Sequence, residues 1–364
     1  MPSIFKKQSS ALRISLRYAG GTSAVLFLTA ALALAAEQGR DIFVLTSTNQ
    51  ASNNVVVFKL STTGTPSLSL VSMLPTGGAG GASGNGGALQ FRGAFGAVVN
   101  YGSNTVSQLA REGNFIGVAK TISLAPGCTN PVSVALAAKH LFVVGANCGE
   151  SHKWPSGAID GAVAAIPDPS AGQIAVGQSW AAVTLKSGTV LQLPLTRGGA
   201  LTGTSATVTL PSDANDTPLG AAFWGNILGF NPAHSPNSLA LVDQNRDIFP
   251  VLGPQPAFPS NAPCWLAKGP GSLWYSGNTP GNAISIFFTD GQGGAFYKSV
   301  PLPGAPTDIT VSADGEWLAV IYTAADGSGA RVAAFGIDGY GDLSPVATSD
   351  PIGVSAFNGV AISQ

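Results

Sequence analysis

The stretch Ala262–Pro301 reads APCWLAKGPGSLWYSGNTPGNAISIFFTDGQGGAFYKSVP, and it decides the fold. It contains four short runs of apolar or alternating residues, at 262–267, 271–277, 282–288 and 295–301. Glycine, proline, asparagine and aspartate separate these runs, which is the pattern of β-strands joined by tight turns. The stretch therefore predicts a small sheet of four antiparallel strands.

The same four-strand unit recurs along most of the chain. Units of this kind begin near residues 87, 131, 173, 217, 262 and 307. A period of about 40–45 residues with four strands in each repeat is typical of a β-propeller, in which every repeat forms one blade. The sequence therefore predicts an all-β propeller with six complete blades.

The two ends of the chain supply one more blade. Residues 41–47, 54–60 and 67–73 have the pattern of second, third and outer strands, whereas 357–362 has the pattern of an inner strand with nothing after it. Joining the two fragments removes two exposed sheet edges and closes the ring. We therefore predict a seven-bladed β-propeller closed by the C-terminal strand joining the N-terminal blade, with six or eight blades as the alternatives.

The first 36 residues differ from the rest. A basic start is followed by the apolar run Ala24–Leu34 and by the small-x-small pattern Ala33-Leu34-Ala35, which signal peptidase recognises. We predict a cleaved secretory signal peptide over residues 1–36 and a single propeller domain over 37–364, with an uncleaved anchor as the alternative. The protein is then expected to be secreted, or periplasmic in a bacterium, with no membrane association after cleavage.

The charge balance limits the class of partner. Four of the 17 basic residues lie in the predicted signal and all 18 acidic residues follow it, so the mature chain carries a net charge of −5. Nucleic-acid binding needs concentrated lysine and arginine, so we expect no nucleic-acid partner. A small-molecule or carbohydrate ligand and a monomeric propeller fit this composition better.

Two cysteines lie close together in the predicted fold. Cys128 and Cys148 flank the strand pair 131–137 and 140–146, and the hairpin register places them nearly opposite each other at its open end. In an oxidising compartment this spacing predicts a disulfide between them. Two buried free thiols are the alternative.

Several segments resemble a known family. Asn100–Ser107 (NYGSNTVS) is similar to the YVTN-type repeats of bacterial surface propellers, and Pro131–Ala135 resembles the inner strand of those repeats. The glycine-rich segment Pro75–Leu89 resembles one in secreted members of the lactonase family of seven-bladed propellers. That family includes 6-phosphogluconolactonase-type proteins and carboxymuconate cyclases. The resemblance implies hydrolysis or isomerisation of a lactone or ring-opened acid at the channel mouth, by His, Arg and Glu side chains without a cofactor.

The candidate catalytic residues lie in one predicted loop. In a propeller, the loops between second and third strands emerge on the same face as the connections between blades, and residues 147–160 form such a loop. Glu150 or His152 would act there as general acid or base, and Lys153 would hold an anionic group. Trp154 is a candidate for substrate binding. In the alternative interpretation the loop is merely solvated and Trp154 packs on a neighbouring blade.

Three further residues are candidates for substrate binding. His234 lies in another loop of the same predicted face, Arg92 follows an inner strand, and Arg246 precedes an outer one. Either arginine could clamp a carboxylate, although an arginine in such a place is more often a surface residue or an ion-pair partner. The sequence has neither H-E-x-x-H nor C-x-x-C, so we expect no metal site. The run 77–87 lacks G-x-G-x-x-G spacing and indicates a flexible loop rather than a phosphate site.

Two functions therefore remain open from sequence. The first is a secreted lactonase-like enzyme acting on a lactone at the mouth of the central channel. The second is a non-catalytic extracellular propeller that binds a carbohydrate, a peptide or a surface component through the same face.

Overall fold

The structure is a computed structural model that describes residues 41–137, 139–210, 217–234, 238–243, 245, 248–252, 262–290 and 293–364. Asp41–Gln364 form one compact unit. The predicted signal peptide, residues 1–36, lies outside the described residues, as does Arg246. Within the described ranges no helix is both long enough and apolar enough to cross a bilayer.

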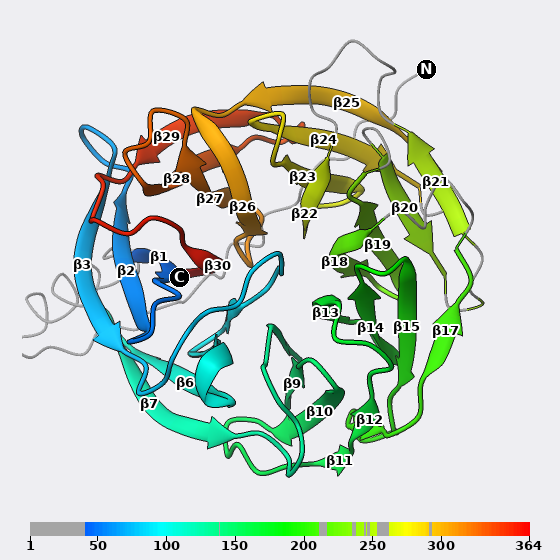
Figure 1. Cartoon of the computed structure of the whole chain (residues 1–364). Helices are drawn as coiled ribbons and strands as arrows, with labels where there is room; N and C mark the ends of the chain where they lie inside the picture. The colour runs from blue at the N-terminus through cyan, green and yellow to red at the C-terminus, as the bar shows by residue number, and fades with distance from the viewer. Residues whose placement is uncertain are drawn as a thin grey trace, which may run out of the picture. The chain divides into compact units, whose positions relative to one another are not determined.

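Seven four-stranded antiparallel sheets form a ring, which confirms the predicted seven-bladed propeller (Figure 1). Blade 1 contains β1 (Ile42–Ser47), β2 (Asn54–Ser61), β3 (Ser67–Pro75) and β30 (Asn358–Ser363). Blade 2 contains β4 (Leu89–Arg92), β5 (Phe95–Asn100), β6 (Thr105–Glu112) and β7 (Phe115–Ser123). Blade 3 contains β8 (Ser133–Leu136), β9 (His140–Val144), β10 (Cys148–Lys153) and β12 (Ala164–Ala165). Blade 4 contains β13 (Ala171–Val176), β14 (Trp180–Leu185), β15 (Thr189–Pro194) and β17 (Ala206–Val208).

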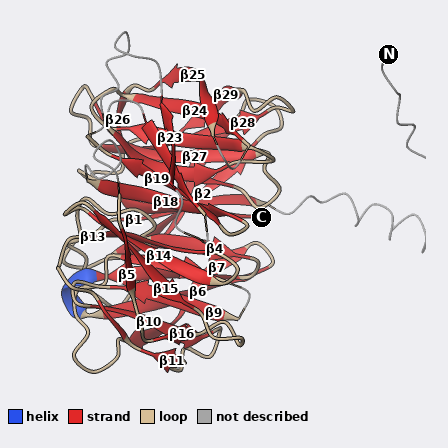
Figure 2. Cartoon of the chain, turned by 90° about the vertical axis from the view of Figure 1, so that its right-hand side faces the viewer, coloured by secondary structure: helices blue, strands red, loops and turns tan. Residues whose placement is uncertain are grey.

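The remaining blades follow the same order. Blade 5 contains β18 (Pro218–Trp224), β19 (Ile227–Pro232), β20 (Ser238–Val242) and β21 (Ile248–Leu252). Blade 6 contains β22 (Pro263–Lys268), β23 (Leu273–Asn278), β24 (Ala283–Thr289) and β25 (Gly294–Pro301). Blade 7 contains β26 (Gly304–Val311), β27 (Trp317–Ala324), β28 (Ala330–Ile337) and β29 (Leu343–Thr348). A short parallel pair, β11 (Gly161–Ala162) with β16 (Leu201–Thr202), links blades 3 and 4. The side view in Figure 2 shows a β-structure whose one described helical element is the 3-10 turn Tyr101–Ser103.

The core lies between successive blades. The middle strands, such as β27 (WLAVIYTA), are near-continuous apolar runs because a neighbouring sheet covers each of their faces. Between blades 6 and 7, for example, Tyr275 and Ile284 pack with Leu318 and Val320, all of them fully or almost fully buried. Each blade is therefore stabilised chiefly by the apolar contacts that it makes with the next one.

The predicted closure of the ring is present. β30 pairs antiparallel with β1, and Thr46 lies opposite Val360. The Thr46 hydroxyl also donates a hydrogen bond to the Gly359 carbonyl at 2.7 Å. Both edges that an open ring would expose are paired in this way.

The ring has two distinct ends around its axis. We call the hairpin face the end that carries the turns between first and second strands, such as 93–94 and 269–272. We call the loop face the opposite end, which carries the connections between blades, such as 76–88 and 124–132. The inner strands β4, β8, β13, β18, β22, β26 and β30 run between these faces and line the channel.

Candidate functional site

A cavity of about 370 Å³ lies in the central channel, lined by residues of the inner strands. Its wall is built largely from alanine, because small side chains on the inner strands leave room near the axis; these residues are Ala135, Ala175, Ala221, Ala267 and Ala361. The lining also includes exposed Arg92 and Gly93 at the first turn of blade 2, together with Gln364 after β30. The cavity therefore opens on the hairpin face.

Two cationic side chains lie at this mouth. The Arg92 guanidinium donates a hydrogen bond to the Leu136 carbonyl at 3.2 Å. The Lys268 ammonium donates to the Gly269 carbonyl at 2.7 Å, and it lies 5.4 Å from the Trp224 ring. Burial lowers the pKa of Lys268 to about 8, so this amine is still mainly charged at neutral pH. Lys268 also donates to the Gly271 and Leu273 carbonyls of its own hairpin, so at the mouth it offers an anionic ligand positive charge rather than a free N–H group.

A single carboxyl group, Asp308, lines the closed end of the cavity. It follows a β-bulge in β26 and is buried, and its oxygens accept hydrogen bonds from the backbone N–H of Gly87 at 3.0 Å and of Ile309 at 2.9 Å. Burial raises the pKa of Asp308 to about 7, against the lowering effect of these backbone hydrogen bonds. A carboxyl group that titrates near neutrality is suited to both accept and return a proton.

The glycine-rich connection between β3 and β4 closes the cavity on the loop face. The Gly86 N–H donates to the Gly172 carbonyl of blade 4, and the Gly87 N–H donates to Asp308 of blade 7. The Asn85 amide donates to the Val132 carbonyl, which precedes blade 3, at 2.6 Å. Figure 1 shows this blue-to-cyan loop entering the centre of the ring. The segment that we expected to be a flexible loop thus makes specific contacts with several blades.

The prediction of a loop over residues 147–160 is wrong for its first part. Residues 148–153 form strand β10 rather than part of a loop over 147–160. Glu150 and His152, two positions apart, point to one face of this strand and are only 1% and 0% exposed. Their side chains lie between blades 2 and 3, away from the channel, and leave no surface for a substrate.

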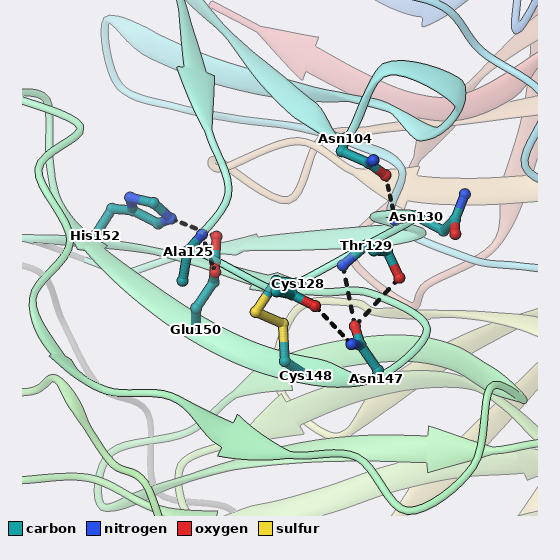
Figure 3. Close-up of a disulfide and its surroundings, with 10 residues drawn as sticks. Asn104, Ala125, Cys128, Thr129, Asn130, Asn147, Cys148, Glu150 and His152 are labelled. Carbon is teal, nitrogen blue, oxygen red and sulfur yellow. Dashed lines mark hydrogen bonds and ion pairs between the residues drawn. A yellow bond between two sulfur atoms is a disulfide. The ribbon is translucent and has the colours of Figure 1, made fainter.

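The buried pair is satisfied within the protein. His152 Nε2 lies 2.8 Å from Glu150 Oε1, and Glu150 Oε2 accepts a hydrogen bond from the Ala125 N–H at 2.7 Å (Figure 3). His152 Nδ1 lies 3.0 Å from the Gly157 carbonyl oxygen. These contacts join β10 to the connection between blades 2 and 3, which is a structural arrangement.

The neighbouring residues have other surroundings. Lys153 is exposed at the end of β10. Trp154 packs edge-on against Phe95 of blade 2, with ring centroids 6.2 Å apart, as the alternative interpretation proposed. His234 is exposed on the loop face, and its Nδ1 lies 3.1 Å from the Thr217 hydroxyl. Arg92 lies on the opposite face, so the predicted binding residues do not converge.

Cys128 and Cys148 form a disulfide, the pair that the hairpin register indicated (Figure 3). Ser133 of β8 pairs with Val144 of β9, which places the two cysteines at the open end of this hairpin. The disulfide fastens the connection between blades 2 and 3 to the start of β10. Both sulfur-bearing residues are buried beside Ala125.

Sequence reasoning missed Asp308 and Lys268. Both lie on inner strands, and Arg92 is the one other charged residue among the described residues that line the cavity. A charged residue on an inner strand was therefore a usable signal, in a chain of which only 10% is charged. We instead expected the site residues in polar loops, because loops carry functional residues more often than strands do.

No family model matches the chain, and no curated protein matches it. Among solved structures, a protein from Lactobacillus plantarum is similar over 90% of this chain and 100% of its own, with a TM-score of 0.65 and 15% identity. A putative 6-phosphogluconolactonase from Bacteroides fragilis is similar over 90% and 99%, with a TM-score of 0.64 and 12% identity. A second one, from Bacteroides uniformis, covers 90% and 100% at a TM-score of 0.64 and 16% identity.

These similarities define the class of fold. The chain shares its propeller fold with two putative 6-phosphogluconolactonases, and the resemblance stated from sequence is confirmed at the level of the fold. At such low identities the similarity concerns the fold alone, so the chemistry must be argued from the cavity itself.

Proposed function

We propose that this chain is a lactonase-like propeller that binds a small lactone, or the acid formed from it, in the channel cavity. Arg92 and Lys268 at the mouth attract the anionic group, and Asp308 at the closed end serves as general acid and base. The observation that carries the proposal is a single carboxyl group, titrating near pH 7, in an alanine-lined cavity of about 370 Å³. Cavities that bind small ligands measure about 300–1,000 Å³.

The proposed reaction needs only water as co-reactant. Asp308 in its ionised form takes a proton from a water molecule as the water oxygen bonds to the lactone carbonyl carbon. The ring C–O bond then breaks, and Asp308 returns the proton to the ring oxygen, which leaves as a hydroxyl group. The product is a hydroxy acid, which loses its carboxyl proton to the solvent, and the two cations at the mouth would attract the resulting anion towards the opening.

We also propose that the protein works outside the cytoplasm. The disulfide between Cys128 and Cys148 supports this location, because such bonds persist in oxidising compartments. The predicted signal peptide over 1–36 agrees with it. A chain found in the cytoplasm with both thiols reduced would contradict the proposal.

Turnover of aldonolactones and muconolactones tests the enzymatic proposal. Asp308→Asn should lower kcat/KM by about 100-fold or more, the usual contribution of a general base, since an amide cannot accept the proton. Asp326→Asn is a matched control, because this carboxyl group is exposed in a turn and should leave turnover unchanged. Full activity of Asp308→Asn would contradict the role of Asp308 as general acid and base.

A non-catalytic binder is the second candidate, and one contact favours it. Both oxygens of Asp308 already accept backbone N–H groups, so the carboxyl group could hold the glycine-rich loop and do no chemistry. In that case the wild-type protein would bind a lactone or sugar acid in calorimetry without converting it. Arg92→Ala should weaken this binding, because it removes a cation from the mouth.

A further inference from the structure

Residues 84–87, which we call the stopper, close one end of the cavity without burying a large side chain. The run 77–87 contains seven glycines and no side chain larger than asparagine. A Cβ atom at Gly86 would lie 2.3 Å from the Gln173 side-chain oxygen, so the close approach requires glycine there. Because apolar burial supplies most packing energy, a segment held by hydrogen bonds alone opens more readily than the blades around it.

Not every buried polar atom has a hydrogen-bond partner where the stopper docks. Its Asn85 amide donates to the Val132 carbonyl and to Asn358 Oδ1, at 2.6 Å and 3.3 Å. Asn85 Oδ1 and Asn358 Nδ2, however, are buried with no hydrogen-bond partner. A buried polar atom without a partner destabilises the conformation that buries it. Withdrawal of the stopper would let water reach both atoms.

We propose that the stopper is a gate docked on Asp308, and that ionisation of this buried carboxyl group opens the cavity to the loop face, because the cost of leaving the charge without water exceeds the gain of a stronger bond from the Gly87 N–H. The inference deepens the proposed function, on which its biological meaning rests, because it describes access to the same cavity. The latch is the bond from the Gly87 N–H to Asp308 Oδ2, 3.0 Å long. When the stopper is in place, it shuts this carboxyl group away from water on the loop face.

The groups around Asp308 fix the direction of the effect. Backbone N–H groups of Ile309, Gly87 and Val360 contact it from its own strand, the stopper and β30, and burial outweighs them in setting its pKa. Lys186 lies beyond the stopper, where its ammonium donates to the Gly84 carbonyl at 3.1 Å. Arg92 and Lys268 line the far mouth of the cavity. None of these cations is a cause of the shift in the pKa of Asp308.

The closed form binds the Asp308 proton more tightly than the open form does. Burial holds its pKa at about 7 when the stopper is in place, and hydration would return it towards 3.8. The closed form is therefore favoured at low pH. Between these two values the opening constant rises with pH, by at most about tenfold per unit, and it levels off above pH 7.

Hydrogen exchange of the Gly86, Gly87 and Val134 amides reports opening of the stopper directly. The Gly86 and Gly87 N–H groups donate from the docked stopper, and the Val134 N–H donates to the Gly87 carbonyl. After correction for intrinsic exchange, the wild-type protein should lose at least about tenfold in protection between pH 5 and pH 7. Asp308→Asn should abolish this pH dependence, since an amide does not titrate. Asp308→Ala should lower protection at every pH, since the latch is gone.

A peptide covering the Gly315 amide, bonded to the Ser312 carbonyl in a turn of blade 7, is the control for general loosening. A pH response of equal size in that peptide, or an unchanged response in Asp308→Asn, overturns the gate. The readout uses no lactone and no turnover. Failure of the proposed enzyme activity would therefore leave the gate standing, and failure of the gate would leave the activity to be judged separately.

Discussion

Asp308 is buried at the closed end of the cavity, and burial raises its pKa from the ordinary 3.8 to about 7. The folded state therefore holds this proton more tightly than the unfolded state does, so the free energy of unfolding falls as pH rises from about 4 to about 7. A shift of about three pKa units corresponds to about 4 kcal/mol at most. Urea unfolding at pH 5 and pH 8 should show about 3 kcal/mol of this loss at most in the wild-type protein, because part of it has already occurred between pH 4 and pH 5.

The matched variant separates Asp308 from every other group. Asp308→Asn has no titrating group at this position, so its free energy of unfolding should change less between the two pH values. At every pH the variant loses one of the two bonds from the Gly87 and Ile309 N–H groups, because its NH2 group cannot accept, so the comparison rests on the slope with pH and not on the absolute stability. Parallel pH profiles for the two proteins would show that Asp308 is not the cause.

Glu150 illustrates the opposite case, in which a chemically attractive side chain is structural. Glu150→Ala would leave His152 and the Ala125 N–H buried without their partner. Breaking such a buried pair typically costs about 3–5 kcal/mol. We expect a lower Tm for the variant, with turnover per folded molecule unchanged. A loss of kcat in fully folded variant protein would restore a catalytic role for this carboxylate.

At the scale of single elements, β10 is a strand that the sequence did not predict. Its residues, CGESHK, have almost no apolar character, so period-two alternation is invisible and a loop was predicted. The structure buries them because Glu150, Ser151 and His152 all find partners between blades. Partners of this kind come from distant segments, and no local pattern announces them. The inner and middle strands, by contrast, were readable because apolar burial leaves a local signature.

The disulfide belongs to the same scale. It joins residues 20 positions apart and so closes a short loop around the hairpin of β8 and β9. Loop-closure entropy for such a length corresponds to about 3 kcal/mol. The Cys128→Ser and Cys148→Ser double variant should unfold at a correspondingly lower urea concentration. Cys264→Ser, which removes the unpaired thiol and keeps the disulfide, is the control and should unfold at the wild-type urea concentration under oxidising conditions.

At the scale of the whole molecule, the number of blades and the closure followed from the repeat, whereas the face that carries the cavity mouth did not. The repeat specifies strands and their order, because each strand records its own burial. Access to the channel depends on where four residues, 84–87, cross the axis, and their small polar composition carries no directional signal. The candidate site was therefore expected on the loop face, and the cavity opens on the other.

Removal of residues 358–364 tests how far the ring depends on its closing strand. The truncated chain would expose the edge of β1 and uncover apolar residues such as Val44 and Phe357. Unpaired edges of this kind promote association. We expect a large drop in Tm and aggregation in size-exclusion chromatography, whereas removal of Gln364 alone should be tolerated. A monomeric truncated protein of normal Tm would contradict this view.

The pairing of β1 with β30 also governs the order of events during biosynthesis. Thr46 finds its partner Gly359 only after 313 further residues have been made. Until then the first sheet lacks its innermost member, and contacts of such long sequence separation form slowly. The nascent chain therefore cannot close its ring until nearly all of it has been made. Strand β30 then completes blade 1 and closes the propeller.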